Sequence, residues 1–427
     1  MTQHKIGWKT AAALVVSNMI GTGVFTSLGY QISDLKNTQT ILLLWVIGGF
    51  LALIGAFIYS ELASKFKQSG GDYIYLSRTY HPLFGYLSSW ISLFVGFSAP
   101  ISLAALAMSK YLNIFGFNLG REFAIAMILI VAIFQSFSIN LSSRFQNVFT
   151  ILKVVFIIVL IGIGFYFVPE VSPNAINFGS SWTNELMLPA FATSLVYVTF
   201  AYTGWNSASY IIEEINQPKK NLPKALFIGV IFVTLSYVLI NFVLLKHGSV
   251  DALSGKEDVA NISFSNILGT NVKWVSCFIA LQLIATISGY LWIGSRLTQA
   301  TAKENKLWSF MAKENKNRIP VRAIWVHAII SILLIFSGDF EVIFTYTSFV
   351  LQILATLAIS TAFFIKKDQL TIIKSRFFYI LPTIFLAFSL YICYFVLIQK
   401  PKESLFGLGI IALGIVIFFF DKNTSKK

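Results

Sequence analysis

The sequence predicts an all-α membrane protein with about twelve transmembrane helices, which follows from composition and from the spacing of apolar runs. Hydrophobic residues make up 56% of the 427 residues and charged residues only 12%, whereas soluble domains carry about 25% charged residues. The mean hydropathy is +0.75. Apolar runs of about 20 residues, the length that crosses a hydrocarbon core, recur along the whole chain.

The apolar runs define the predicted spans, separated by charged or turn-rich breaks. They lie near 8–30, 39–63, 82–109, 122–140, 147–168, 188–214, 223–245, 272–300, 322–337, 340–365, 376–398 and 404–420. No small-residue cleavage site separates the first run from a soluble domain. We therefore expect this run to be a retained span and not a signal peptide.

The basic residues give the orientation. Most Lys and Arg side chains fall in one set of loops, which includes the N-terminus, segments 64–81 and 296–322, and the C-terminal tail. The positive-inside rule then places both termini in the cytoplasm of a multi-pass protein of the cell (inner) membrane. The net charge of +14 is explained by this topology and by attraction to anionic membrane lipid. It predicts no nucleic-acid partner.

The sequence contains no pattern typical of a disulfide scaffold, a metal site or an enzyme active site. Cys277 and Cys393 both lie in apolar runs and the four histidines are scattered, so we expect no disulfide scaffold and no metal site. We predict no catalytic residues, no cofactor and no enzyme activity. A channel, or a sensor on a transporter fold, remains a less favoured alternative; a sensor usually carries a soluble appendage larger than the tail "DKNTSKK".

Two spans are interrupted by glycine. The first contains "NMIGTGVFTS" and the sixth contains "TFAYTGWNSAS", although glycine costs about 1 kcal/mol inside a helix. If spans 1–5 and 6–10 are repeats, each begins with a broken span, and the odd number of spans inverts one repeat. This predicts a first repeat over 1–168, an inverted second repeat over 169–366, and two extra helices with a short cytoplasmic tail over 367–427. Paired interruptions of this kind point to a transporter's binding site.

A pair of facing breaks suits a zwitterion. Backbone N–H groups freed at the start of one half-helix attract a carboxylate, and freed carbonyls accept an ammonium group. Gly21 and Gly23 permit the turn and a close approach of ligand to the backbone, and Thr22 adds a hydroxyl. The alternative is that these glycines only let helices pack closely.

Lys153 is the one basic residue inside a predicted span. It lies nine residues from Arg144, about 13 Å along a helix, and intramembrane lysines usually mark ion or proton paths. We expect it to organise the site or to couple transport, with protons as a candidate partner because burial disfavours the charged form of lysine. The alternative is a fixed structural cation bonded to carbonyls of the first break. Glu61 and Asp72 are either gate ion pairs or ordinary interfacial charges.

At these motifs the chain resembles the amino acid–polyamine–organocation (APC) family, in particular its L-type and bacterial amino-acid permeases. The similar segments are "IGTGVF", "FAYTGWNSASYIIEEINQPKKNLPKAL", "SELASKFKQSGGDYIYL" and "SRLTQATAKENKLW". The resemblance covers at least residues 7–365. It implies the five-plus-five inverted-repeat fold with broken helices 1 and 6, and secondary transport of α-amino acids by alternating access.

The resemblance also implies roles for individual residues. The substrate carboxylate would contact Gly21, Thr22 and Gly23. The ammonium group would contact backbone carbonyls of Met19 or Ile20 in the first break and of Phe200, Ala201 and Thr203 in the second. Phe200 would cap the substrate, Tyr290 would line the side-chain pocket or gate, and Asn206 would lie near the pocket. Lys153 would stand where sodium-coupled relatives bind sodium.

Departures from the family pattern refine the expected function. Thr203 replaces a frequent glycine and narrows the site, and no acidic residue lies in the middle of a span to neutralise a cationic substrate. We therefore expect neutral amino acids, with a cationic amino acid or polyamine as the alternative. Because Lys153 would stand in the sodium position, we also expect sodium-independent exchange or proton-coupled transport. The 110–121 loop has no cysteine, so we expect no disulfide-linked glycoprotein partner and a monomer or homodimer.

Overall fold

The computed structural model describes residues 5–137, 139–167, 179, 181–303, 308–370, 372 and 376–424. Its α-helices are α1 Trp8–Met19, α2 Gly23–Gln31, α3 Thr38–Phe66, α4 Asp72–Thr79, α5 Pro82–Ile91, α6 Ala99–Leu112, α7 Arg121–Gln135, α8 Ile139–Tyr166, α9 Trp182–Glu185, α10 Pro189–Ala201, α11 Pro218–His247, α12 Val250–Leu253, α13 Val259–Leu268, α14 Val272–Ala302, α15 Val321–Ile335, α16 Phe340–Ser360, α17 Ile380–Gln399 and α18 Pro401–Thr424. Each predicted span coincides with one helix or with consecutive helices.

The helices confirm an all-α membrane protein. Within the described residues, eight helical segments are long and apolar enough to cross a membrane, and α1 with α2 forms a ninth that is bent by 43°. The shorter α10 and α15 are also apolar, and α7 covers residues 122–135 of the predicted span 122–140. The third span is continuous from α5 to α6 through a π-helical segment, η1, Ser92–Ser98.

One predicted boundary was wrong. The sequence suggested a loop between residues 140 and 147, but α8 begins at Ile139, so Arg144 lies in a helix. A helix of 28 residues is about 42 Å long, and the hydrocarbon core is only about 30 Å thick. The first turns of α8 can therefore extend beyond the apolar layer. The predicted repeat boundary at 168–169 lies outside the described residues.

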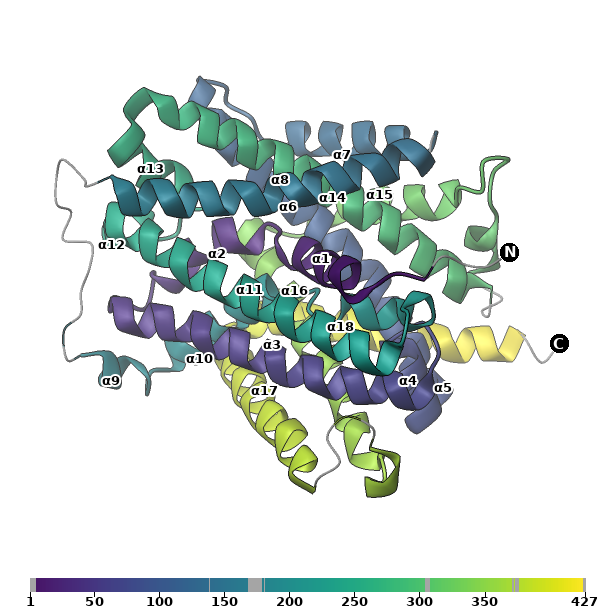
Figure 1. Ribbon diagram of the computed structural model, residues 1–427. Helices are drawn as coiled ribbons and strands as arrows, with labels where there is room; N and C mark the ends of the chain where they lie inside the picture. Colours follow the sequence, from purple (N-terminus) through teal and green to yellow (C-terminus); the bar gives the residue numbers. More distant parts are fainter. Residues whose placement is uncertain are drawn as a thin grey trace.

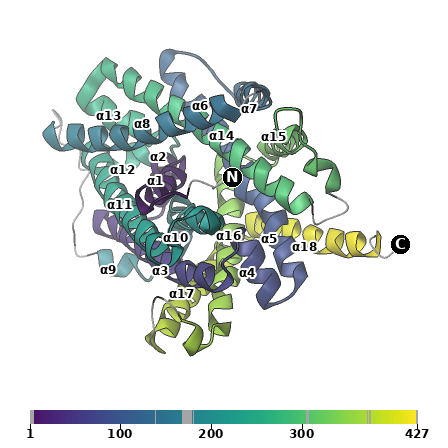
Figure 2. The same ribbon diagram turned by 45° about the vertical axis from the view of Figure 1, so that its right-hand side comes forward.

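The broken spans lie in the middle of the helix bundle. Figure 2 shows α1 and α10 near the centre, with the other helices around them. α1 packs on α8 and α11, while α10 packs on α2, α3, α16 and α17. The chain enters α1 and leaves α18 at one end of the molecule, and α9 and α12 lie at the other end (Figure 1). This arrangement brings the two interruptions together inside the protein.

Backbone hydrogen bonds also join the starts and ends of the broken spans. Ile6 N donates to the carbonyl of Glu214 at 2.8 Å, and Asn216 N donates to the carbonyl of Ile6 at 2.9 Å. These bonds form an isolated parallel bridge between Ile6 and Ile215. The segment before α1 is thereby tied to the segment that follows the second break.

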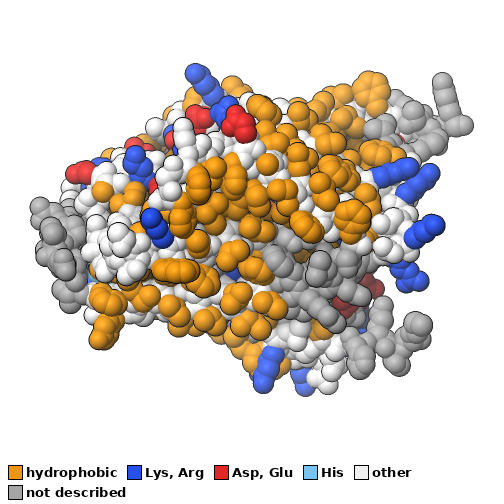
Figure 3. Space-filling view, turned by 90° about the horizontal axis from the view of Figure 1, so that it is seen from above, with side chains coloured by type: hydrophobic (Ala, Val, Ile, Leu, Met, Phe, Trp, Pro, Cys, Tyr) orange, Lys and Arg blue, Asp and Glu red, His pale blue; other side chains and the backbone are white. Residues whose placement is uncertain are grey.

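The surface fits a membrane protein. In Figure 3 hydrophobic side chains cover the middle of the molecule, and Lys and Arg side chains lie mainly toward its ends. Large exposed apolar residues include Ile151, Ile158, Leu235 and Phe420. A contiguous apolar belt of this extent is expected where lipid, and not water, is the solvent.

Candidate binding site at the paired helix breaks

The first break leaves backbone donors at the start of α2. α1 ends at Met19 and α2 begins at Gly23, and Thr22 makes no side-chain capping bond. The first N–H groups of a helix have no partner within the helix, and they carry the positive end of the helix dipole. A Cβ added to Gly21 would meet nothing nearer than Thr286 Cγ2 at 3.9 Å. Gly21 therefore has room for a methyl group, in ordinary van der Waals contact with its neighbours.

The second break turns around Gly204. α10 ends at Ala201, and a 3₁₀ segment, η3, follows over Ser207–Glu214. Gly204 has a φ of +97°, and a Cβ there would lie 2.8 Å from the carbonyl of Asn18. Only glycine satisfies both the left-handed conformation and this close approach. The turn thus presses against the end of α1.

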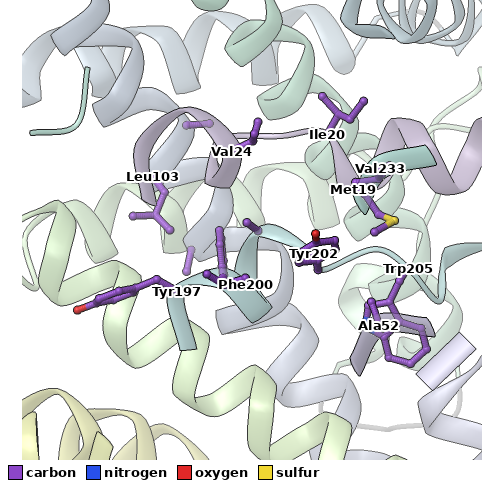
Figure 4. Close-up of a cluster of buried hydrophobic side chains, with 14 of the residues drawn as sticks. Met19, Ile20, Val24, Ala52, Leu103, Tyr197, Phe200, Tyr202, Trp205 and Val233 are labelled. Carbon is purple, nitrogen blue, oxygen red and sulfur yellow. The ribbon is translucent and has the colours of Figure 1, made fainter. Parts of the chain in front are cut away.

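The two breaks also touch at Gly23. A Cβ on Gly23 would lie 2.6 Å from Ala201 Cα. Figure 4 shows Met19, Ile20 and Val24 across from Phe200 and Tyr202 in this buried cluster. Gly23 therefore serves close packing, whereas a methyl group at Gly21 would clash with nothing.

This difference predicts opposite effects on stability. Gly23→Ala should lower the Tm of the purified protein in detergent, because forcing a methyl group against packed backbone costs about 1–3 kcal/mol. Gly21→Ala should leave the Tm unchanged because its methyl group finds room. Equal losses of Tm in both variants would contradict this assignment of the two glycines.

Protein donors occupy the carbonyls of both breaks. The Tyr237 hydroxyl, from α11, lies 2.6 Å from the carbonyl oxygen of Met19 and 3.2 Å from that of Ala201. The carbonyl of Phe200 accepts bonds from the backbone N–H of Thr203 at 2.9 Å and from its Oγ1 at 2.7 Å. Sequence reasoning missed Tyr237, whose only signal is a hydroxyl within an apolar run. It links the broken spans directly.

Lys153 binds the first break. Its side chain is 3% exposed, and Nζ donates to the carbonyl of Ile20 at 3.0 Å and to Thr286 Oγ1, in α14, at 3.2 Å. The ammonium group thus joins α8, the first break and α14. These are the contacts expected of a fixed cation that holds the break in shape.

The remaining predicted residues lie around the second break. The Phe200 ring meets Phe344 edge-on, with centroids 4.8 Å apart, and the Tyr290 side chain lies next to that of Thr203. Asn206 points elsewhere: its Nδ2 donates to the Tyr210 hydroxyl at 3.2 Å. Phe200, Thr203 and Tyr290 are therefore grouped, and Asn206 belongs to a neighbouring cluster.

That cluster surrounds Asp72 at the start of α4. The buried carboxylate accepts hydrogen bonds from the hydroxyls of Tyr59 and Tyr210, the latter at 2.7 Å. Burial raises the pKa of Asp72, and the two tyrosine hydroxyls partly oppose this shift. Glu61 is also buried and accepts the backbone N–H of Ile372 at 2.6 Å. Both carboxylates are buried and not solvated, and among the described residues the hydrogen-bond partners of the Asp72 carboxylate are tyrosines.

The space beside the second break is small. A cavity of about 40 Å³ is lined by residues of α3, α10, α16 and α17 and by the turn that follows α10, among them Gly48, Phe200, Thr203, Ser348 and Gln352. Such a volume holds water molecules but is far below the range of about 300–1,000 Å³ found for ligand pockets. The breaks are packed together in this conformation, so a ligand of amino-acid size requires them to separate.

Comparison with known proteins identifies the protein family of this chain. A family model described as amino acid permease matches residues 6–420, almost the whole chain. The chain belongs to this amino acid permease family. It is a multi-pass amino acid transporter and not an enzyme, as the sequence predicted.

Mammalian relatives of this permease align along nearly its full length. It is 28% identical to the b(0,+)-type amino acid transporter 1 of Mus musculus, over 98% of this chain and 88% of the relative. It is 28% identical to the large neutral amino acids transporter small subunit 2 of Homo sapiens, over 100% of this chain and 82% of the relative. The Asc-type amino acid transporter 1 of Mus musculus is 27% identical, over 98% of this chain and 81% of the relative.

Proposed function

We propose that this permease carries neutral α-amino acids by alternating access, with one substrate bound between the two breaks. The observation that supports this most strongly is the uncapped start of α2 beside Gly21, where an added Cβ would make only ordinary van der Waals contact. The substrate carboxylate would bind the N–H groups of Gly21, Thr22 and Gly23. The ammonium group would share the carbonyls of Met19, Ile20 and Ala201 with the donors Tyr237 and Lys153, since a carbonyl oxygen can accept two bonds.

The binding site would combine elements of two inverted repeats. We propose 1–168 and 169–366 as the repeats, followed by the two extra helices. α1 with α2 and α10 with η3 would be the corresponding broken spans. Separation of the breaks on one side, while contacts such as the Ile6–Ile215 bridge persist on the other, would give alternating access.

Substrate charge follows from the composition of the spans. No acidic residue lies in the middle of a predicted span, and burying an unpaired cationic side chain costs several kcal/mol. A relative named for large neutral amino acids supports the same class. The Thr203 side chain beside Tyr290 reduces the room, so the largest aromatic substrates should be disfavoured.

The proposed substrate is tested by counterflow in proteoliposomes. Vesicles loaded with unlabelled amino acid should accumulate labelled L-alanine or L-leucine with saturable kinetics. Labelled L-arginine should accumulate poorly. Efficient arginine uptake that neither leucine nor alanine inhibits would contradict the neutral class, and absence of saturable counterflow for every amino acid would contradict transport.

We also propose sodium independence. The Lys153 ammonium occupies the space between the first break, α8 and α14, and a second cation there would be repelled by several kcal/mol at low dielectric. Uptake should therefore be unchanged when choline replaces sodium. Steep sodium dependence would contradict the proposal. Dependence on an imposed pH gradient would indicate proton coupling, and its absence would indicate exchange.

We propose that the permease works without a disulfide-linked glycoprotein. Cys277 and Cys393 lie within α14 and α17, and the segment 110–121 contains no cysteine. The protein would be a monomer or homodimer in the cell membrane with both termini in the cytoplasm. Purification of the single chain in an active form tests this.

A further inference from the structure

A second cavity lies at the end of the molecule opposite the start of α1. Its volume is about 510 Å³, and it is lined by residues near the end of α6, before and at the start of α7, before α13 and around the start of α16. We call it the outer cavity and define it by Lys110, Arg121, Glu257, Asp339 and Phe340. Its size falls in the range of about 300–1,000 Å³ that is typical of small-molecule sites.

Glu257 is the unusual residue of the outer cavity. Its Oε2 atom is buried and, among the described residues, has no hydrogen-bond partner. Burial raises the pKa of Glu257 to about 7, and nearby Lys110 lowers it only in part. A buried acceptor without a donor costs about 1–3 kcal/mol of stability, more when it is charged. A partner from outside the chain would remove this cost.

The two basic side chains of the outer cavity, Arg121 and Lys110, differ in whether they form a salt bridge. Arg121 is paired with Asp339, with Nη2 and Oδ1 2.9 Å apart. Lys110 is exposed and takes part in neither of the two salt bridges found in the described parts of the chain. The outer cavity therefore presents an unpartnered carboxylate oxygen together with an ammonium group, a pair that matches the two charges of an α-amino acid.

We propose that the outer cavity binds a second zwitterionic amino acid, with its ammonium group on Glu257 and its carboxylate on Lys110. This rests on the proposed function, because it assigns the same class of substrate to another site. The neutral side chain would lie toward Phe340. Bound there, the amino acid would wait at the entrance to the central site.

Two features connect the outer cavity to the breaks. Phe340 stacks on Tyr30 with centroids 5.8 Å apart, and Phe344 contacts both Tyr30 and Phe200. This aromatic stack separates the outer cavity from the second break. In addition, Gly255 N donates to the carbonyl of Gly29 at 2.8 Å, so the loop that carries Glu257 is attached to α2. A ligand on Glu257 is thus placed to affect the half-helix that begins at the first break.

Equilibrium binding of labelled L-leucine to the full-length protein in nanodiscs tests the proposal. The unmodified protein should bind two molecules per chain, and Glu257→Gln and Lys110→Gln should each bind one. Asp251→Asn, which alters an exposed carboxylate outside the cavity, should still bind two. Isoamylamine, which keeps the ammonium group and lacks the carboxylate, should compete at least tenfold more weakly than leucine at the site that Glu257→Gln removes.

The results of these binding experiments test the outer site and the central site separately. One molecule per chain in the unmodified protein, or two in Glu257→Gln, would overturn the outer site, as would isoamylamine competing as well as leucine. Gly21→Ala should remove central binding and keep the Glu257-dependent molecule. Binding of two molecules that Gly21→Ala leaves intact would instead contradict the central site. The Tm of Glu257→Gln should equal or exceed that of the unmodified protein, which shows that the variant folds.

Discussion

Replacing Lys153 by alanine should reduce amino-acid uptake at least tenfold while the protein still reaches the membrane. The variant leaves the carbonyl of Ile20 and the Thr286 hydroxyl without the cation that joins them. An unsatisfied buried group costs about 1–3 kcal/mol, and each 1.4 kcal/mol corresponds to a factor of about ten. Initial uptake rates in proteoliposomes measure the effect.

Lys246→Ala is the matched control for this experiment. Its ammonium group also donates to a backbone carbonyl, that of Gly164 at 3.2 Å, but far along α8 from the break. Uptake by this variant should stay near that of the unmodified protein. Equal uptake by Lys153→Ala and the unmodified protein would show that the first break keeps its shape without the cation.

Tyr237→Phe should slow transport about tenfold with little change in expression. Removing the hydroxyl takes a donor from the carbonyls of Met19 and Ala201, at a cost of about 1–3 kcal/mol. The two broken spans then lose their shared partner in the closed conformation. The counterflow rate at saturating substrate is the appropriate measurement.

Tyr346→Phe provides the comparison for Tyr237→Phe. Tyr346 is equally buried, and its hydroxyl lies 3.2 Å from Ser337 Oγ, away from the breaks. Its transport rate should be close to normal. If both tyrosine variants transported at the same rate, the link between the broken spans through Tyr237 would have no role in turnover.

The fold was largely predictable because hydrophobicity and helix breakers act locally. Runs of apolar residues located every span, and Gly21-Thr22-Gly23 located the bend of 43° between α1 and α2. The start of α8 was not predictable from hydropathy. Polar residues such as Asn140, Ser142 and Arg144 interrupt the apolar pattern in its first turns, and the helix continues through them.

The site was less predictable because it depends on contacts between distant segments. Sequence spacing suggested that Lys153 lies deep in the membrane, but only the fold brings Nζ to the carbonyl of Ile20. Nothing in the sequence distinguishes Gly21, where a methyl group would fit without a clash, from Gly23, which packs on Ala201. Tyr237 was missed for the same reason, since it is a single hydroxyl in an otherwise apolar segment. Tyr59 and Tyr210 were missed because they come from separate segments, α3 and η3, that only the fold brings to Asp72.

Gly21→Ala tests whether substrate binds at the first break. The added methyl group meets nothing nearer than 3.9 Å, so it should leave the fold intact and occupy space needed by the substrate carboxylate. Gly162→Ala, at an exposed position of α8 with open space around it, is the control. We expect at least a tenfold loss of saturable L-leucine counterflow in Gly21→Ala and normal counterflow in Gly162→Ala. Normal counterflow in both variants would contradict binding at the first break.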